Sequence, residues 1–424
     1  MTKKKFTLID LFAGCGGLSL GLEQAGFIPI YVNELNNDAL ESYLINRDNQ
    51  FPYLRKKLNS NDIKDVVSDE KFFEKFKSEI KKNLNLDLKD TPVDLLVGGP
   101  PCQGFSGIGI RRSYSVDKIQ LPSNHLYQDM AYMIFKIQPK IFLFENVRGL
   151  LSARWTKNGI KGEIFNDVLN TFTEIPNYII KYKLLHAKDY GVPQNRPRVI
   201  LVGLNKNYFK DVNRENIDAI EGGFLPKPTN DYPNIEEILS DLVDKDFEYG
   251  GESKFYSKAP QNKWQKMFRS KNNGNSSYLN DLSEQQYSRH SETVIKRFNF
   301  MIKNNGKIPE ELKTKKFAQR VLPKVWSNSG PSITTCSLPD DFVHYSQPRS
   351  ITVREMARIQ TFPDWYKFHG KRTTGGIRRA GNPRTSIFDR EVPKYTQIGN
   401  AVPPKLAYEI GKFFKNLILR NEIS

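Results

Sequence analysis

The sequence has few of the features of a disulfide-bonded, zinc-binding or membrane-spanning protein. It contains three cysteines in 424 residues, an odd and small number that argues against a disulfide framework and predicts a reducing, cytoplasmic setting. No Cys and His residues have the spacing of zinc ligands, so we expect no metal site. No apolar run approaches the roughly 18 residues needed to span a bilayer, and the first one ends in a glycine turn rather than a signal-peptide cleavage site. We therefore expect a cytoplasmic protein without a membrane partner.

Positive charge, in contrast, is in excess. The 64 Lys and Arg residues against 47 Asp and Glu residues give a formal net charge of +17. Such a balance suits a polyanionic partner, but basic composition alone does not separate nucleic-acid-binding proteins from other Lys-rich proteins. A chain of 424 residues also exceeds the size that one hydrophobic core usually serves, so we expect two domains.

Short apolar runs alternate with segments of helical length in the first half of the chain. This alternation predicts an α/β fold with a doubly wound, mostly parallel sheet in residues 1–205. The next part, 206–350, is polar, basic and aromatic without such alternation, and we predict a second, smaller domain there. We expect residues 351–397 to form a hinge with a basic insertion, and 398–424 to form an amphipathic helix that packs back on the first domain.

A glycine turn follows the first predicted strand. Gly14, Gly16 and Gly17 let the backbone approach a ligand closely at the carboxyl end of that strand, where open α/β sheets bind cofactors. Glu34 ends the next apolar run and is placed to accept hydrogen bonds from ribose hydroxyls. These features are shared by nicotinamide and S-adenosylmethionine enzymes, so they do not name the cofactor.

Cys102 is the candidate nucleophile. It lies in the segment GGPPCQGFS, where two prolines stiffen the loop before it and glycine and serine loosen the loop after it. A lone cysteine is usually a small buried apolar residue, but this polar loop favours a presented nucleophile.

Two further groups of polar residues flank predicted strands. Glu145 lies at the carboxyl end of an apolar run, on the same predicted sheet edge as Cys102, where a carboxyl group can donate a proton or act as a structural cap. Arg196 and Arg198 precede the run 199–202 and offer bidentate donors to a carboxylate, a carbonyl oxygen or a phosphate.

Together these segments make the chain resemble the cytosine-5 DNA methyltransferase family. Six separate motifs occur in the family's order, which makes the resemblance specific and favours it over a nicotinamide dehydrogenase. A Rossmann-like fold that binds S-adenosylmethionine, with a target-recognition domain beside it, is what the resemblance implies. The matching stretches are DLFAGCGGLSLGLEQAGF, GGPPCQGFSG, FENVRGL, QNRPRVILVG, TVREMARIQTFPD and QIGNAVPP.

The resemblance also implies a reaction and roles for these residues. Family members add a thiolate to C6 of a flipped-out cytosine, which makes C5 able to attack the methyl group of S-adenosylmethionine; Cys102 matches that thiolate. Glu145 matches the residue that contacts N3 and the exocyclic amine of the base, and Arg198 matches the one that binds the base oxygen and orients the glutamate, while Arg196 supports the site. We expect Arg111 and Arg112, after Cys102, to lie on a loop that closes over DNA.

For the cofactor, the resemblance implies a pocket built from several separated segments. Two departures from the family pattern stand out: Leu35 replaces an aromatic residue that often covers the adenine, and the stretch 124–127 matches its motif only loosely. The implied positions are Phe12, Ala13, Gly14, Gly16, Gly17 and Leu18 at the methionine end, Glu34 at the ribose, Asp62 and Ile63 at the adenine, and Pro100, Leu126, Asn400 and Ala401 around them.

The predicted recognition domain should read base edges in the major groove of double-stranded DNA. Most protein–DNA hydrogen bonds go to the backbone, so each single candidate is more often a phosphate contact or a solvated charge. We also expect the basic insertion between Gly370 and Lys394 to contact the DNA backbone through Arg378 and Arg379. The candidate base readers are Lys263, Lys266, Arg269, Arg289, His290 and Arg297, among Trp264, Phe268, Tyr278 and Tyr287.

Other functions remain open on the sequence. A bacterial modification enzyme that acts as a monomer and protects DNA from a partner restriction endonuclease is favoured by the small size of the chain. An RNA cytosine methyltransferase is the alternative within the fold, and a non-catalytic DNA-binding protein would need no Cys102, Glu145 and Arg198 together. The recognition sequence depends on a few side-chain contacts that no motif encodes.

Overall fold

Seven strands form one sheet in the first half of the molecule. The computed structural model describes residues 5–101, 122–212, 223–271, 277–309, 311, 319–325, 342–374, 378 and 391–423. The strands lie in the order β3-β2-β1-β4-β5-β7-β6, and all run parallel except β7, which is antiparallel to both neighbours. This confirms the predicted mostly parallel sheet. The strands are β1 (Phe6–Leu11), β2 (Phe27–Asn33), β3 (Asn59–Ser60), β4 (Leu95–Gly98), β5 (Ile141–Val147), β6 (Tyr178–His186) and β7 (Pro197–Asn205).

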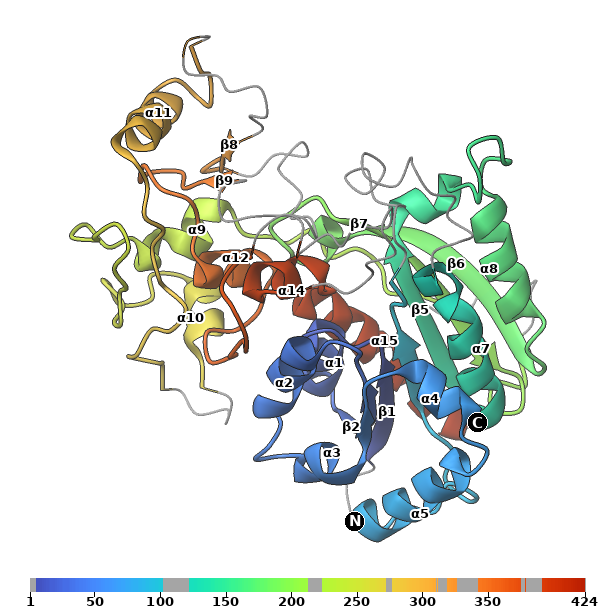
Figure 1. The fold of residues 1–424 in the computed structure, drawn as a ribbon. Helices are drawn as coiled ribbons and strands as arrows, with labels where there is room; N and C mark the ends of the chain where they lie inside the picture. Colours follow the sequence, from blue (N-terminus) through green and yellow to red (C-terminus); the bar gives the residue numbers. More distant parts are fainter. Residues whose placement is uncertain are drawn as a thin grey trace.

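Helices cover both faces of this sheet, because successive strand residues alternate between two apolar cores. Leu96 and Phe142 belong to one core, whereas Leu95 and Ile141 belong to the other. Figure 1 shows α7 and α8 beside β5 and β6, and α1 near α15. The doubly wound architecture predicted from the alternating runs is therefore confirmed. The helices of this sheet region are α1 (Gly17–Gln24), α2 (Asn37–Ile45), α3 (Pro52–Lys57), α4 (Ile63–Ser68), α5 (Phe72–Leu84), α7 (Leu126–Ile137) and α8 (Glu163–Thr173).

The last helix, α15 (Pro404–Ile423), returns to the sheet region as predicted. Leu406, Ile410 and Phe414 are fully buried in the core that also contains Leu22 of α1. The two helices approach so closely that a Cβ on Gly21 would lie 2.1 Å from the carbonyl oxygen of Pro404. Among the described residues, no helix, including this one, is both long and apolar enough to cross a membrane.

A second region, which we call the helical region, comprises the described residues between 223 and 401. Its apolar core is formed mainly by short helices and loops, and it also contains Cys15 and Leu20 of the sheet region. Figure 1 shows α12 and α14 between α10 and the sheet region. The division of the chain at residues 205, 350 and 397 stays a prediction. The elements are α9 (Ile235–Leu239), α10 (Lys263–Arg269), α11 (Glu292–Lys303), β8 (Arg320–Val321), β9 (Phe342–Val343), α12 (Val353–Ile359) and α14 (Lys394–Asn400).

Buried ion pairs connect the segments of the helical region. Arg358 of α12 bonds Asp241 and Asp364, and all three side chains are at most 1% exposed. Arg349 and Glu355 form a second buried pair, with a shortest distance of 2.6 Å. Buried charges require such partners, so these pairs fix which segments can lie together.

Candidate active site

Several of the predicted site residues lie at one edge of the sheet. β1, β2, β4 and β5 are parallel, so the turns after Leu11, Asn33, Gly98 and Val147 emerge at their common carboxyl edge. The antiparallel strand β7 begins at the same edge, because Arg198 pairs with Val147. The fold therefore brings the glycine turn, Glu34, the segment before Cys102, Glu145 and the two arginines to one side of the molecule.

Glu145 and Arg198 form the central pair of this edge. Arg198 Nε lies 2.7 Å from Glu145 Oε1, and the two side chains are 9% and 11% exposed. Burial lowers the pKa of the Arg198 guanidinium, and the charge of Glu145 opposes this effect. An arginine keeps its charge at neutral pH, so the pair holds the carboxyl group in a fixed orientation.

Arg196 connects the catalytic strand to the segment before the last helix. Its Nη2 donates to the carbonyl oxygens of Gly399, at 2.7 Å, and Asn400, at 3.3 Å. The side chain is 1% exposed, and burial together with the nearby Arg198 cation lowers its pKa. Arg196 thus fixes the backbone at Gly399 and at the predicted cofactor residue Asn400.

The segment before Cys102 packs directly on this pair. Asn146 Nδ2 donates to the carbonyl oxygen of Pro100 at 3.2 Å. A Cβ on Gly99 would lie 2.8 Å from Glu145 Oε2, so only glycine lets the loop pass this close to the carboxyl group. Cys102, and with it Arg111 and Arg112, lies outside the described residues, but Pro101 immediately before it is exposed.

The glycine turn and Glu34 form a second part of the edge. Gly14 N–H donates to Glu34 Oε2 and Asn36 N–H donates to Oε1, both at 2.8 Å. Burial raises the pKa of Glu34, while these two hydrogen bonds counteract it by favouring the carboxylate. Each oxygen keeps a further lone pair, so the carboxylate can still accept hydrogen bonds from a ribose.

The same turn leaves room for a ligand and fits against the end of the chain. Gly14 has a φ of +57° and no atom within 4 Å of the place where a Cβ would stand. At Gly17 a Cβ would lie 2.4 Å from the carbonyl oxygen of Val402 and 3.0 Å from Ala401 Cβ. The structure thereby places Gly17 against Ala401 and leaves open space at Gly14, as a cofactor pocket requires.

The other predicted cofactor residues lie on adjoining elements. Phe12 and Ala13 are partly buried in the turn, where Phe12 has a φ of 57°, and Leu18 is buried in the first turn of α1. Asp62 caps α4, since its Oδ1 accepts the backbone N–H of Lys64 at 2.8 Å, and Ile63 begins that helix.

Leu126 and Leu35 are the remaining positions that the sequence singled out around the cofactor. Leu126 begins α7, which an ion pair of 2.7 Å between Lys64 and Asp129 joins to α4. Leu35, which departs from the family pattern, is 65% exposed next to Glu34.

Sequence reasoning did not single out three residues that the structure places at this edge. Asn146 lies inside a recognised motif but was given no role, although it bonds Pro100. Arg47 and Tyr366 donate to the carbonyl oxygens of Gly16 and Cys15 respectively. Tyr366 is 351 residues from Cys15, and no local pattern can indicate such a contact.

Several candidate base readers are buried in the helical region. Arg269 is 5% exposed, bonds the carbonyl oxygens of Lys258 and Leu279, and stacks 3.7 Å above the Tyr256 ring, so its prediction as a DNA contact is wrong for the described structure. Trp264, Phe268 and Tyr287 are also buried, since their rings fill the core. The remaining candidates are the exposed Lys263, Lys266 and Arg289, with the partly exposed Tyr278, His290 and Arg297.

The described ends of the basic insertion are anchored to their surroundings. Arg372 donates to the carbonyl oxygen of Gln286 and to Ser288 Oγ, and Lys371 pairs with Glu391 at 3.0 Å. Arg378 is exposed, with its nearest ion-pair distance 3.9 Å to Glu391. Arg379 lies outside the described residues, and the contact of this insertion with DNA stays a prediction.

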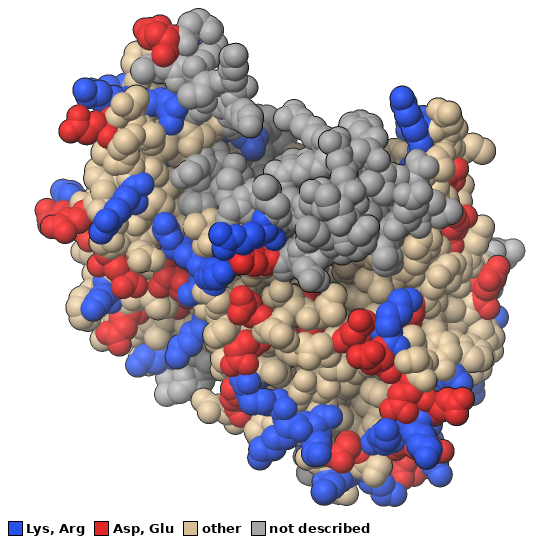
Figure 2. Space-filling view, in the orientation of Figure 1, with Lys and Arg blue, Asp and Glu red and all other residues tan. Residues whose placement is uncertain are grey.

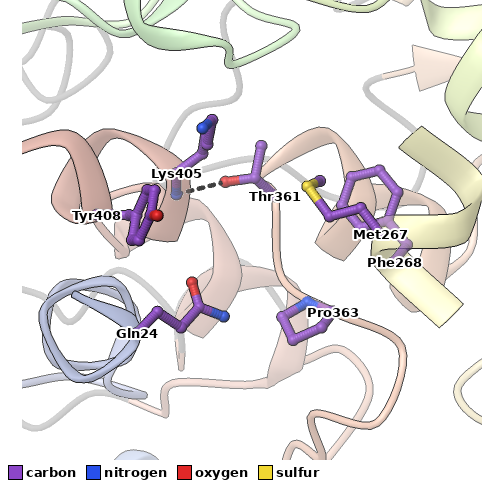
Figure 3. A pocket seen from close by; sticks show the side chains of 7 residues that line it. All are labelled: Gln24, Met267, Phe268, Thr361, Pro363, Lys405 and Tyr408. Atoms are coloured by element: carbon purple, nitrogen blue, oxygen red, sulfur yellow. Dashed lines mark hydrogen bonds between the residues drawn. The ribbon is translucent and has the colours of Figure 1, made fainter. Parts of the chain in front are cut away.

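Two surface features do not identify the site. On the face that Figure 2 shows, Lys and Arg side chains lie among Asp and Glu side chains over both regions, so the charge does not mark the site in this view. A pocket of about 320 Å³ lies between α1, α10 and α15, and Figure 3 shows Thr361 Oγ1 bonded to the backbone N–H of Lys405 at its wall. It contains none of the predicted catalytic or cofactor-binding residues. Its lining is Gln24, Met267, Phe268, Thr361, Pro363, Lys405 and Tyr408.

Comparison with known proteins gives one consistent result. A family model described as C-5 cytosine-specific DNA methylase matches residues 6–416. The Type II methyltransferase M.DdeI of Desulfomicrobium norvegicum is 31% identical, over 98% of this chain and 91% of that protein. M.FnuDI of Fusobacterium nucleatum, also a Type II methyltransferase, is 30% identical over 98% and 96% of the two chains.

Solved structures have the same fold. A putative DNA modification methyltransferase encoded within an E. coli prophage superimposes with a TM-score of 0.66 at 24% identity, covering 98% of this chain and 99% of that one. The Entamoeba histolytica methyltransferase EhMeth gives a TM-score of 0.52 at 14% identity, with coverage of 98% and 99%.

Proposed function

Because the chain belongs to the C-5 cytosine-specific DNA methylase family, we propose that it methylates C5 of a flipped-out cytosine in a specific short sequence of double-stranded DNA, through a covalent bond between Cys102 and C6. The observation that carries this proposal is the pair of Glu145 and Arg198, held at 2.7 Å beside the segment that leads into Cys102. S-adenosylmethionine supplies an electrophilic methyl group when it is bound.

The positions of Glu145 and Arg198 support separate roles toward the cytosine. Arg198 holds one carboxyl oxygen of Glu145, which leaves the other, Oε2, facing Gly99, three residues before Cys102. N3 takes up a proton through Glu145 as the Cys102 thiolate adds to C6, so that no net negative charge develops on the ring. Arg198 Nη1 also donates to the carbonyl oxygen of Pro197 at 2.8 Å, and the guanidinium has further N–H groups that can bind the base oxygen.

The later steps restore the aromatic base. The addition leaves a double bond between C4 and C5, and the electron pair of this enamine would attack the methyl group of a bound donor as the bond from that carbon to sulfur breaks. The C5 proton then leaves, the Cys102–C6 bond breaks, and N3 returns its proton to Glu145. The net products are 5-methylcytosine, S-adenosylhomocysteine and one proton, with Cys102 regenerated.

The geometry of the glycine turn supports S-adenosylmethionine as the methyl donor. Glu34 would bind the ribose, since both of its oxygens are already oriented by backbone N–H groups. Gly14, with open space at its Cβ position, and the junction of Gly17 with Ala401 would accept the methionine end. Asp62 and Ile63 would hold the adenine at the start of α4.

The biological role that fits this activity is protection of DNA from a cognate restriction endonuclease. Support comes from relatives at 30–31% identity that are named Type II methyltransferases. We propose the same role for this chain.

The decisive experiment measures transfer of labelled methyl groups from S-adenosylmethionine to bacterial DNA, with modified positions mapped by sequencing. We expect 5-methylcytosine at one fixed short sequence for the wild type and none for Cys102→Ser. For Glu145→Gln, we expect kcat to fall by about 10²- to 10⁴-fold while S-adenosylhomocysteine binding is retained. Methyl transfer that survives Cys102→Ser would overturn the covalent mechanism, and transfer to RNA alone would overturn the DNA substrate.

A further inference from the structure

Two side chains that have no role in the proposed reaction, Tyr366 and Arg47, donate hydrogen bonds to backbone carbonyl oxygens of the glycine turn. Tyr366 OH donates to the carbonyl oxygen of Cys15 at 2.5 Å. Arg47 Nη2 donates to the carbonyl oxygen of Gly16 at 3.3 Å, and its Nη1 donates to Tyr366 OH at 3.1 Å. The two side chains therefore act as one hydrogen-bonded unit under the turn.

Both side chains are themselves fixed by their surroundings. Arg47, at 2% exposure, pairs with Glu23 at 2.7 Å and lies 3.7 Å above the Tyr43 ring. Tyr366 is fully buried, and its backbone carbonyl accepts a hydrogen bond of 3.0 Å from Arg354. Arg354 in turn bonds Ser283, so the unit connects the glycine turn to the helical region.

Gly16 makes this close support possible. It has a φ of +85°, and a Cβ there would lie 2.7 to 2.9 Å from Tyr43, Arg47 and the Tyr366 hydroxyl. The space under the turn is thus filled by the polar groups that bond its carbonyls. Because the carbonyl and N–H of a trans peptide point in opposite directions, holding the Gly16 carbonyl down aims the Gly17 N–H away from Arg47, at the start of α1.

We propose that Arg47 and Tyr366 are positioning residues for the methyl donor. By holding the Cys15 and Gly16 carbonyls, they keep the turn in the conformation that presents its backbone N–H groups, and the positive end of α1, to the carboxylate of the methionine end. The inference rests on the proposed S-adenosylmethionine site, but it concerns residues that touch neither the cofactor nor the cytosine.

The test compares Tyr366→Phe with Tyr395→Phe in the full-length protein. Tyr395 is a matched control, because it is also buried in the helical core and its hydroxyl donates to a backbone carbonyl, that of Ile351, at 2.8 Å. Binding of S-adenosylhomocysteine is measured by calorimetry without DNA, alongside the Tm of the unliganded protein. Methyl transfer then gives KM for S-adenosylmethionine and kcat.

For Tyr366→Phe we expect Kd and KM to rise by about tenfold, with kcat at saturating donor changed by less than about twofold. Tyr395→Phe should lower Tm by a similar amount but leave Kd and KM unchanged. Since Arg47 bonds the Tyr366 hydroxyl, Arg47→Lys should also raise Kd, and the double variant should show less than the product of the two effects.

Equal falls in Tm for the two Phe variants with no change in Kd would show that Tyr366 has only a structural role, and would overturn the inference. That result leaves the proposed function intact, because methyl transfer by the wild type is scored separately. Failure of the wild type to bind S-adenosylhomocysteine at all would instead overturn the proposed donor.

Discussion

The sheet region satisfies its buried polar groups mainly through backbone hydrogen bonds between strands, whereas the helical region does so largely through charged side chains. Strands β5 and β7 pair over seven consecutive positions, from Ile141 with Leu204 to Val147 with Arg198. In the helical region two-residue strands provide almost no ladder, and fully buried arginines such as Arg349 and Arg358 bind carboxylates instead.

Hydrogen bonds between strands fix the relative positions of residues by register. Residues at strand ends, such as Glu145 and Arg198, therefore lie at one edge whatever the surrounding loops contain. A network of buried ion pairs depends on the identity of each partner. The sheet region can therefore keep the same reactive residues in place when its loops change. The helical region, which depends on particular side-chain pairs, can support surface loops that differ between proteins.

The largest effect is expected from breaking a buried pair of the helical region. Asp241 is fully buried and pairs with Arg358 at 2.5 Å, so Asp241→Asn leaves a buried arginine with one carboxylate fewer. We expect the free energy of unfolding to fall by about 3–5 kcal/mol, measured by urea denaturation and tryptophan fluorescence.

The control for that variant lies in the same region. Asp231→Asn removes a pair with Lys263 whose side chains are 64% and 66% exposed, and it should cost about 0–1 kcal/mol. Equal small losses for both variants would contradict the view that buried ion pairs stabilise the helical region.

A second prediction concerns the exposed cations of the sheet region, which contrast with the buried ones of the helical region. Arg154, Lys157 and Lys161 are exposed on the segment after β5, and the described part of the chain offers them no ion-pair partner. Glu163 fixes this segment by accepting the backbone N–H groups of Trp155 and Ile160. This segment follows β5 at the carboxyl edge of the sheet, where the proposed site lies, and we predict that it contacts DNA phosphates.

Replacing Arg154, Lys157 and Lys161 by Ala should reduce the salt dependence of DNA binding. We expect the slope of the logarithm of the association constant against the logarithm of the salt concentration to become shallower by up to about 2.7. Binding would be measured by fluorescence anisotropy over a range of salt concentrations. Replacing Lys56, Lys57 and Lys82 by Ala removes the same charge from exposed positions on α3 and α5, and should leave the slope unchanged. The same slope for both triple variants would remove the first segment from the DNA interface.

The smallest effect is expected from a buried histidine of the helical region. Burial, assisted by the Arg349 charge, lowers the pKa of His344 to about 3, whereas an exposed histidine has a value of about 6.5. The unfolded chain therefore binds a proton that the folded protein excludes. The contribution of His344 to the free energy of unfolding has its full value above about pH 6.5, and it falls by up to about 1.4 kcal/mol per pH unit below that pH.

His344→Asn should make that loss shallower, while its side-chain oxygen can still accept the N–H groups that His344 Nδ1 accepts from Ser346 and Gln347. The free energy of unfolding would be compared between about pH 7 and about pH 5.5, above the range where Glu355, with a pKa lowered to about 2, loses its charge-dependent stability. Parallel pH profiles for the variant and the wild type would show that His344 does not contribute.

The sequence predicted the sheet region well because its signals are local. Apolar runs with the period of buried strands, a glycine turn and an amphipathic last helix each depend on near neighbours. Parallel strands place the residues at their carboxyl ends at one edge, so the grouping of Glu34 and Glu145 was predictable before any contact was known. Arg198 lies at the start of β7 and joins them only because that strand is antiparallel, which the sequence did not indicate.

By itself the sequence thus determined the sheet, its polar edge and, through motifs, the family of the chain. Tertiary structure decided which charged side chains are buried: Arg269 was predicted to contact DNA but packs in the core, whereas Arg47 and Tyr366 support the glycine turn from distant positions. The reason is physical. The buried face of a strand or helix is indicated by a repeating pattern of apolar residues. An arginine, in contrast, can be buried at any position where the folded chain brings a carboxylate, an aromatic ring or a carbonyl oxygen close to it.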